Sequence, residues 1–502
     1  MMSVTMAEAA SQSAPPPEAA AALADTGDRV PLVVDLDGTV IKSDTLWEAI
    51  FAMVAQRPWL AMLVPVWLLR GRAHLKRMVA TRAVLDPAWL PYHEPMVTLI
   101  REARDAGRPI VLATATDMLL ADPVREHLGV FDHLIASEGG VNKRGQAKVD
   151  AIRELLGEGD FDYAGDSDAD VALVAAARRT ILVNPSVKLR RAAEARGNVA
   201  TLFDDRPATW RGLLRLMRPH QWVKNVLLLV PLLLAHRADD WVLWGQALAA
   251  LVSFCLAASS VYVFNDLLDV ESDRRHPRKR SRPLAAASVK TPEALGLAMG
   301  AIAASLAIAW AGVGWPFVLM VIGYLVFTTL YSTVLKQKVF IDVLTLAWLF
   351  TYRILAGAVA VGVVISPWLA VFSVFIFLSL ALLKRVGEVR EMATGEATNP
   401  RRGYRGEDLT VLRTLGMVSG YLSVLVVGQY IYSDAVAELY RTPELLWLVA
   451  VLQLHVISRL WLLANRGVLE DDPLVFLVKD PQSLLAAGLA GATIVAATFV
   501  EL

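Results

Sequence analysis

An aspartate-rich segment ends one of the long apolar runs of this chain. Asp266, Asp269 and Asp273 follow one another at spacings of three and four residues, which on a helix would place them on one face, within about sixty degrees of arc. Carboxylates this close repel one another unless a hard cation lies between them, and Mg²⁺ prefers a few carboxylates together with the phosphate oxygens of a substrate. The segment therefore predicts a magnesium site that binds a diphosphate. The simpler alternative is a solvated helix end beside a basic loop.

A second acidic pattern lies close to the N-terminus. The apolar run Val30–Val34 predicts a buried strand, and Asp35 and Asp37 follow it directly. Open α/β sheets bind ligands at the carboxyl ends of their parallel strands, so this position favours a catalytic or binding site. The alternative is that both carboxylates only cap a turn between a strand and a helix.

Composition divides the chain into two unlike parts that must position these clusters. Hydrophobic residues make up 55% of the 502 residues, and the mean hydropathy is +0.46. This average is too apolar for one soluble protein, yet about the first two hundred residues are ordinary in composition. Residues 1–28 are rich in Ala, Pro and Ser without a basic segment before an apolar core, which predicts a disordered tail and not a signal peptide. We expect a soluble domain at 29–207 and a membrane domain at 208–502.

The balance of charges and the cysteine content exclude some classes of protein. Lys and Arg together number 49, as do Asp and Glu, and no long basic face indicates a nucleic-acid partner. Cys255 is the one cysteine and lies in an apolar run, so it cannot form an intrachain disulfide and is expected to be a packing residue.

Apolar runs long enough to cross a bilayer, at roughly twenty residues each, fill the chain after Leu216. We expect nine spans, of which the first is short enough to be re-entrant: 222–236, 244–265, 291–313, 315–334, 339–362, 366–383, 410–433, 443–463 and 482–500. Basic residues concentrate after the second, fourth and sixth runs, and by the positive-inside rule these loops face the cytoplasm. We therefore expect a multi-pass protein of a bacterial inner membrane, in contact with membrane lipids, whose soluble domain and acidic clusters are cytoplasmic.

The soluble part carries four motifs in order. They are Asp35-Leu36-Asp37-Gly38-Thr39-Val40, then Ile110-Val111-Leu112-Ala113-Thr114, then Gly145-Gln146-Ala147-Lys148, and finally Gly165-Asp166-Ser167-Asp168-Ala169-Asp170. In this order and spacing the region resembles the haloacid dehalogenase phosphatases up to about Pro207. The resemblance implies a Rossmann-like α/β fold with a helical cap at about 45–109.

The same resemblance implies a role for each motif residue. Asp35 would be the nucleophile that forms an aspartyl-phosphate, and Asp37 would be the general acid and base. Thr114 and Lys148 would hold the phosphoryl group. Mg²⁺ would bind to Asp35, Asp166 and the carbonyl of Asp37, with Asp170 orienting the site.

The expected cap contains two unusually apolar stretches, 50–54 and 59–69. They are either ordinary cap core or helices that lie on the membrane surface or on the second domain, with Arg70, Arg72, Lys76 and Arg77 beside lipid headgroups. The sequence leaves both open.

The aspartate-rich segment, which begins Asn265-Asp266 and includes Asp269 and Asp273, resembles the motif of the UbiA superfamily of intramembrane prenyltransferases. The resemblance covers the rest of the chain and implies an all-α membrane domain. Members of that family normally carry a second pair of aspartates after the fourth span. Here Asp342 is present, but Leu346 stands at the second position, which weakens an aromatic-prenyltransferase assignment.

Further stretches resemble a narrower branch, the polyprenyl-phosphate phosphoribosyltransferases. They are Arg218–Asn225, Asp273–Pro283, and Lys384-Arg385 with Glu388. This resemblance implies phosphoribosyl diphosphate as donor and a polyprenyl phosphate as acceptor, with Asp269 and Asp273 holding Mg²⁺. The expected substrate-binding residues are Lys224, Asn265, Lys279, Arg280, Arg282, Tyr331, Lys336, Asp342, Arg353, Lys384 and Arg385. For any single lysine or arginine at a span end, a role in topology alone is the alternative. A charge at membrane depth usually lines a cavity or pairs, so Arg353 is expected to face the substrate chamber near Asp342.

Together the two resemblances imply a bifunctional enzyme with one Mg²⁺ in each domain. It would transfer 5-phosphoribosyl to polyprenyl phosphate and then remove the 5-phosphate, giving polyprenyl-phosphoryl ribose, a lipid-linked pentose donor. One alternative is an aromatic prenyltransferase fused to an unrelated phosphatase, against which Leu346 argues. Another is a membrane scaffold or transporter with a regulatory N-terminal domain, against which the catalytic motifs in both halves argue. A homo-oligomer is left open.

Overall fold

The computed structural model describes residues 30–138, 142–235, 237, 239–393, 403–469 and 472–500. The tail expected at 1–28 lies outside these residues. The chain divides into two compact units. The first unit is the chain up to Leu213 together with Asp266–Ala294, and the second unit is Leu214–Asn265 together with Leu295–Leu502. The aspartate-rich segment from Asp266 onward therefore belongs to the same unit as the soluble domain.

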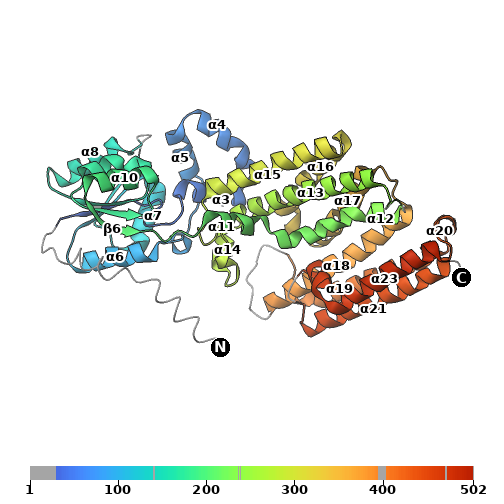
Figure 1. Cartoon of the computed structure of the whole chain (residues 1–502). Helices are drawn as coiled ribbons and strands as arrows, with labels where there is room; N and C mark the ends of the chain where they lie inside the picture. The colour runs from blue at the N-terminus through green and yellow to red at the C-terminus, as the bar shows by residue number, and fades with distance from the viewer. Residues whose placement is uncertain are drawn as a thin grey trace. The chain divides into compact units, whose positions relative to one another are not determined.

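The first unit is built on a six-stranded parallel sheet (Figure 1). The strand order is β3-β2-β1-β4-β5-β6, with β1 Leu32–Val34, β2 Ile110–Asp117, β3 His133–Ser137, β4 Asp162–Gly165, β5 Thr180–Val183 and β6 Val199–Phe203. Val33 of β1 is in register with Val111 of β2 on one side and with Tyr163 of β4 on the other. The order of the strands reverses at β1, and ligands of such sheets bind outside the carboxyl ends at this switch point. Asp35 is the first residue after β1 and lies there.

Helices cover both faces of the sheet, as alternation along β1 requires (Figure 1). Leu32 and Val34 pack with residues of α6 (Glu94–Asp105) and α7 (Met118–Leu128), whereas Val33 packs with residues of α8 (Gln146–Leu156) and α9 (Val171–Ala176). The sheet is thus buried on both sides, which explains why its strands are continuous apolar runs. The short η3 (Asp168–Asp170), α10 (Val187–Arg196) and α11 (Thr209–Met217) complete this part of the chain.

A helical cap follows β1. It consists of α3 (Thr45–Gln56), η1 (Pro58–Met62), α4 (Leu63–Leu69), α5 (Arg72–Ala80) and η2 (Pro87–Trp89). The Asp44 carboxylate accepts hydrogen bonds from the backbone N–H groups of Leu46 and Trp47, and so starts α3. The cap has its own small apolar core, in which α3, α4 and α5 pack together. The first unit also includes α14 (Val270–Arg275) and η5 (Lys279–Ser281).

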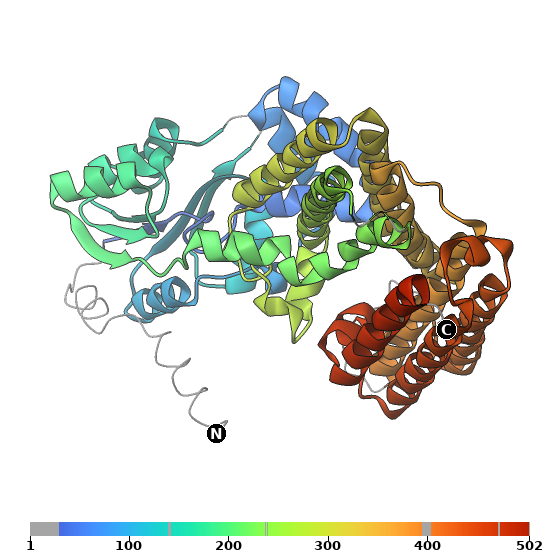
Figure 2. The same ribbon diagram turned by 45° about the vertical axis from the view of Figure 1, so that its right-hand side comes forward.

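The remaining elements are helical. The long helices are α13 (Trp241–Leu268), α15 (Thr291–Gly312), α16 (Trp315–Thr333), α17 (Ile341–Val361), α18 (Pro367–Ala393), α19 (Leu409–Ile431), α21 (Leu446–Arg466) and α23 (Pro481–Phe499), and the short ones are η4 (Pro219–Leu229), α12 (Val230–Leu234), η6 (Leu335–Gln337), η7 (Gly406–Asp408), α20 (Asp434–Leu439), η8 (Pro443–Leu445) and α22 (Pro473–Lys479). Figure 1 and Figure 2 show α18, α19, α21 and α23 packed side by side. The expected class, an α/β domain followed by an all-α membrane domain, is confirmed.

Eight helical stretches of the described chain are long and apolar enough to cross a membrane, and each overlaps one of the nine expected runs. The expected run without such a helix is 222–236, which lies in η4 and the five-residue α12. Pro231 has no N–H to donate to the preceding turn, so a regular helix cannot run through it from η4. This run is therefore not a ninth long helix.

Candidate active sites

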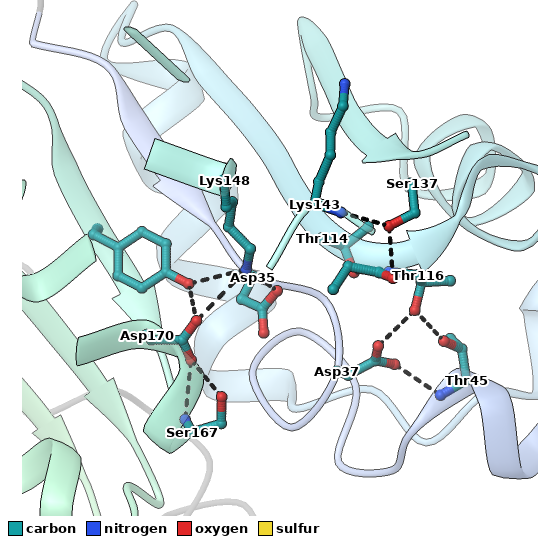
Figure 3. A network of polar contacts seen from close by, with 12 residues as sticks. Asp35, Asp37, Thr45, Thr114, Thr116, Ser137, Lys143, Lys148, Ser167 and Asp170 are labelled. Carbon is teal, nitrogen blue, oxygen red and sulfur yellow. Dashed lines mark hydrogen bonds and ion pairs between the residues drawn. The ribbon is translucent and has the colours of Figure 1, made fainter. Parts of the chain in front are cut away.

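Asp35 and Lys148 meet at the carboxyl end of β1. Asp35 is 7% exposed, and its backbone N–H donates to the carbonyl of Ala164 at 3.0 Å, which extends the pairing of β1 with β4. The Nζ atom of Lys148, on α8, lies 2.8 Å from Asp35 Oδ1 and 3.5 Å from Asp170 Oδ1 (Figure 3). The fold thus brings together three residues that are far apart in the sequence and that the phosphatase motifs single out.

Asp37 is held by two threonines. Its Oδ1 accepts from the backbone N–H of Thr45 at 2.7 Å, and its Oδ2 accepts from the hydroxyl of Thr116 at 2.6 Å (Figure 3). The two threonine hydroxyls are 2.6 Å apart, and the buried Thr114 hydroxyl accepts from the N–H of Thr116. Sequence reasoning missed Thr45 and Thr116. Thr116 has a signal, because it lies two positions after Thr114 on the same strand and residues at that spacing share a face.

Three carboxylates of the described chain are grouped closely enough to hold a metal ion. Asp35, Asp166 and Asp170 each offer an oxygen, and these oxygens all lie within 4.8 Å of one another. Burial raises the pKa of Asp35 to about 7 although Lys148 opposes the rise, and burial together with Asp35 raises the pKa of Asp166 well above its usual value. Hard oxygen ligands that repel one another in this way fit a divalent cation such as Mg²⁺.

A glycine and two hydroxyl groups shape this group of carboxylates. Gly38 has φ +78°, and a Cβ atom there would lie 2.2 Å from Asp166 Oδ2. Asp170 accepts from the hydroxyl of Tyr163 at 2.7 Å, from the hydroxyl of Ser167 at 2.8 Å and from the N–H of Ser167 at 3.0 Å. Asp170 is therefore fixed in place, as expected for an orienting residue. Tyr163 was not predicted, because nothing in its strand distinguishes it from a core residue.

The aspartate-rich segment is interrupted at Asp269. The helix α13 ends at Leu268, Asp269 has φ −99° and ψ 6°, and α14 begins at Val270. The expectation of one continuous helix is therefore wrong at this residue. The N–H of Asp273 still donates to the carbonyl of Asp269 at 2.8 Å.

Arg282 links the first and last carboxylates of this segment. Its NH1 atom lies 2.7 Å from Asp273 Oδ2 and 3.3 Å from Asp266 Oδ1, and both aspartates are buried. Burial raises the pKa of Asp273, with Arg282 opposing the rise. A positive group of the chain thus lies between two of the predicted metal ligands.

Arg274, the residue after Asp273, joins α14 to the cap within the first unit. Its NH2 and NH1 atoms donate to the two carboxylate oxygens of Glu48, at 2.7 and 3.0 Å, and its Nε donates to the carbonyl of Ala285. The pair is 8% and 11% exposed. Arg275 instead forms an exposed pair with Asp86 at 3.1 Å. Neither contact was predicted, because both join segments more than 180 residues apart.

Arg353, in the second unit, is surrounded by uncharged partners. Its Nε donates to Asn225 Oδ1 at 2.9 Å, its NH1 to the carbonyl of Leu349 and its NH2 to the Tyr324 hydroxyl at 3.0 Å. The expectation that it lies near Asp342 is wrong, because the two residues are eleven positions apart on α17, a rise of about 16 Å along the helix. Asn225 ends the stretch Arg218–Asn225 that resembles the phosphoribosyltransferases, but the sequence analysis assigned it no role.

Asp342 and Arg385 form a fully buried ion pair. Arg385 NH2 lies 2.5 Å from Asp342 Oδ2, and the Tyr404 hydroxyl donates to Asp342 Oδ1 at 2.6 Å. Arg385 also contacts Glu388. Leu346 packs against the apolar cluster beside these groups. The two expected substrate residues thus have each other as partners and join α17 to α18.

Lys224 and Lys384 share one carboxylate. Asp472 Oδ2 accepts from Lys224 Nζ at 2.6 Å and from Lys384 Nζ at 3.1 Å. Asp472 was not predicted, since an aspartate directly before a proline is typical of a helix cap, which Asp472 also is. The cluster carries a net positive charge and fits an anionic group.

The other expected substrate residues lie at helix ends. Asn265, on α13, Tyr331, near the end of α16, and Lys336, in η6, are half-buried. Lys279 and Arg280 lie in η5, the first half-buried and the second exposed.

The chain is similar to known proteins in both of its parts. A model of the UbiA prenyltransferase family matches residues 226–398, and a model of haloacid dehalogenase-like hydrolases matches residues 32–175. Uncharacterized protein y4nM of Sinorhizobium fredii is 37% identical over 93% of this chain and 91% of its own length. Decaprenyl-phosphate phosphoribosyltransferase of Mycolicibacterium smegmatis is 33% identical over 44% of this chain and 70% of its own length. The chain belongs to the UbiA prenyltransferase family.

This UbiA-family chain also carries a haloacid dehalogenase-like domain, so both resemblances read from the motifs are confirmed. Its membrane part is similar in structure to a UbiA homolog from Archaeoglobus fulgidus, which is 18% identical, with 58% of this chain and 100% of that chain covered and a TM-score of 0.42.

Proposed function

We propose that this UbiA-family protein is a bifunctional membrane enzyme that acts twice on one pentose. It transfers 5-phosphoribosyl from phosphoribosyl diphosphate to polyprenyl phosphate, and its phosphatase domain then removes the 5-phosphate to give polyprenyl-phosphoryl ribose, a lipid-linked pentose donor. The observation that carries the proposal is the Asp35 cluster, present in the same chain as a domain related to decaprenyl-phosphate phosphoribosyltransferases. Such a transfer leaves a phosphate monoester on the ribose, and that is the bond this cluster is equipped to break.

In the transfer step, an oxygen of the lipid phosphate bonds to the anomeric carbon of the ribose while the bond from that carbon to the diphosphate breaks. Asp266, Asp269 and Asp273 would hold Mg²⁺, which when bound draws charge onto the departing diphosphate. Arg282 is placed to exchange its carboxylate partners for phosphate oxygens, and Lys279 and Arg280 supply further positive charge.

The second acidic position supports a phosphoribosyl donor over a prenyl diphosphate. Leu346 contributes an apolar side chain, and Asp342 is already neutralised by Arg385 and bonded by Tyr404. A second carboxylate pair for a second cation is therefore lacking at the position where prenyl-transferring relatives would place it. The net positive cluster of Lys224, Lys384 and Asp472 supports an additional phosphate contact.

In the phosphatase step, a carboxylate oxygen of Asp35 attacks phosphorus and the bond to the ribose O5 breaks. Asp37 gives its proton to that oxygen, and then takes one from the water that hydrolyses the aspartyl-phosphate, releasing inorganic phosphate. Thr45 and Thr116 keep Asp37 oriented for both transfers. Thr114 and Lys148 would hold the phosphoryl oxygens, and Mg²⁺ on Asp35, Asp166 and the Asp37 carbonyl would neutralise them, with Asp170 as orienter.

We further propose that the protein resides in a bacterial inner membrane with both sites on the cytoplasmic side. The eight apolar helices support a multi-pass protein, and phosphoribosyl diphosphate is a soluble, highly charged donor that does not cross lipid unaided.

Two single substitutions test the two steps separately. Membranes containing the full chain are incubated with radiolabelled phosphoribosyl diphosphate and polyprenyl phosphate, and the lipid extract is analysed by mass spectrometry. With Asp273→Asn, we expect no labelled lipid but undiminished hydrolysis of a soluble phosphate ester. With Asp35→Asn, we expect labelled lipid that is heavier by one phosphate, because an amide cannot attack phosphorus. Fully dephosphorylated lipid from Asp35→Asn membranes, with other phosphatases excluded, contradicts the second step. Full transfer by Asp273→Asn contradicts the metal assignment.

A further inference from the structure

The cap of the first unit exposes an apolar surface. We name η1 and α4, Pro58–Leu69, the platform. Its Leu60 and Trp67 face inward and are buried in the cap core. Six other large apolar side chains of the platform face outward, with exposed fractions from 40% to 88%: Trp59, Met62, Leu63, Val66, Leu68 and Leu69. The platform is therefore apolar on both faces.

Core packing does not explain the outward face. Single exposed apolar residues are normal on a soluble domain, but a run of them on one short segment indicates a surface that meets something apolar. Met62 is 75% exposed and Leu69 is 88% exposed, so neither contributes to the cap core. The outward face must have a partner outside the first unit's own core.

The charges around the platform indicate what that partner is. Between Glu48 and Asp86 the chain has no Asp or Glu and six Lys or Arg residues: Arg57, Arg70, Arg72, Lys76, Arg77 and Arg82. Lys76, Arg77 and Arg82 have contacts within the first unit. Arg57, Arg70 and Arg72 are exposed and flank the platform at both ends. Within the described residues, these three have no carboxylate partner in the ion pairs of the structure. Apolar side chains framed by unbalanced positive charge match a bilayer surface that contains anionic lipids.

We propose that the platform inserts its outward side chains into the headgroup region of an anionic lipid bilayer, with Arg57, Arg70 and Arg72 beside the lipid phosphates. The eight apolar helices of the same chain keep a bilayer at high local concentration, so a weak surface contact is enough. Trp59 is of the residue type that prefers the interface. The contact goes beyond the proposed reactions, because it concerns where the cap lies and not what the phosphatase cleaves.

A single-cysteine experiment on the full chain tests this proposal. Cys255 is the one cysteine and is buried, so it is replaced by serine, and Leu69→Cys is introduced and labelled with an environment-sensitive fluorophore. The protein is reconstituted in nanodiscs of phosphatidylcholine with or without phosphatidylglycerol, with doxyl-labelled lipid as quencher. Val187→Cys, at a side chain 69% exposed on α10, is the matched control.

We expect the label at 69 to be quenched several-fold more than the label at 187 in anionic discs, and less in neutral discs. Replacing Arg57, Arg70 and Arg72 by glutamine together should reduce the quenching at 69. Met62→Cys provides a second position if Leu69→Cys fails to fold. Absence of quenching at both platform positions, or a blue-shifted label that lipid quenchers do not reach, overturns the proposal, since the latter indicates cover by protein. Equal quenching in the two kinds of disc overturns the assignment to anionic lipid.

Discussion

At the scale of single residues, the proposed phosphatase site depends on a glycine, Gly38. Gly38 lies close after Asp35, the proposed nucleophile, and the carboxylate of Asp166 fills the space that a Cβ atom of residue 38 would occupy. The loop therefore needs glycine for two reasons, its positive φ and this close approach.

Alanine substitutions separate those two reasons. Gly38 and Gly107 both have φ +78°, but a Cβ at Gly107 would meet nothing within 4 Å. Both Gly→Ala changes should cost about 1 kcal/mol of stability from backbone strain. Only Gly38→Ala displaces Asp166, so it should slow hydrolysis of a soluble phosphate ester on the order of a hundredfold. Gly107→Ala should stay within about twofold, and pentose transfer should persist in both. Equal rates in the two variants would show that Asp166 has room to move.

The positions of the candidate catalytic residues were predictable where a motif fixes them locally, and the positions of their partners were not. Asp35 and Asp37 follow a strand directly, so the end of that strand places them. Tyr163, whose hydroxyl donates to Asp170, is placed beside Asp35 by the pairing of β1 with β4. No short stretch of sequence predicts that pairing, because it joins distant segments. The same limit explains the error at Arg353, whose actual partner Asn225 lies more than a hundred residues away.

At the scale of elements, α14 connects the aspartate-rich segment to the cap. Asp273 and Arg274 are neighbours on this short helix, the first bound by Arg282 and the second by Glu48. A six-residue helix has too few internal hydrogen bonds to hold itself, so these side-chain contacts set its position.

Two adjacent arginines test this role of α14. Arg274→Gln leaves Glu48, whose side chain is 11% exposed, without its charged partner, which costs about 3 kcal/mol, and should slow pentose transfer about tenfold or more because Asp273 shifts. Arg275→Gln removes two exposed ion pairs, with Asp86 and with Glu271, each worth less than about 1 kcal/mol, and should change the rate less than about twofold. The initial rate of label entering lipid measures both. Adding Glu48→Gln to Arg274→Gln should recover part of the loss, because the unpaired charge is gone. Equal effects of the two arginine variants contradict a positioning role.

The membrane helices were the most predictable elements. Long apolar runs have few alternatives to a spanning helix, because lipid offers no hydrogen-bond partner to an open backbone. The prediction of a spanning helix at 222–236 was wrong because Pro231 and the polar residues Lys224 and Asn225 interrupt the apolar run. Both polar side chains have partners elsewhere in the second unit.

At the scale of the whole molecule, the two proposed activities would share a lipid intermediate. That intermediate would carry a polyprenyl chain and diffuse in the plane of the bilayer. Full-length chains that each lack one activity should then complement one another.

Co-reconstitution tests this expectation. Asp35→Asn and Asp273→Asn chains placed in the same vesicles should together form dephosphorylated polyprenyl-phosphoryl ribose, although neither does so alone. The same two variants in separate vesicles should form much less, because the lipid intermediate leaves a bilayer slowly. Mass spectrometry of the extracts distinguishes the products. Failure in shared vesicles, with each remaining activity intact, would mean that the intermediate passes only within one chain.

The position of the parallel sheet ahead of the apolar helices has a consequence for how the protein is made. The last strand ends at Phe203, and the first long apolar helix ends at Leu268. A ribosome adding about 5–20 residues per second needs several seconds to cover that interval, and α/β domains commonly fold within seconds or faster. The sheet can therefore close before the first spanning helix is complete. A folded sheet is a poor substrate for threading through a narrow translocation pore, so early folding would itself keep this domain on the side of the membrane where translation takes place.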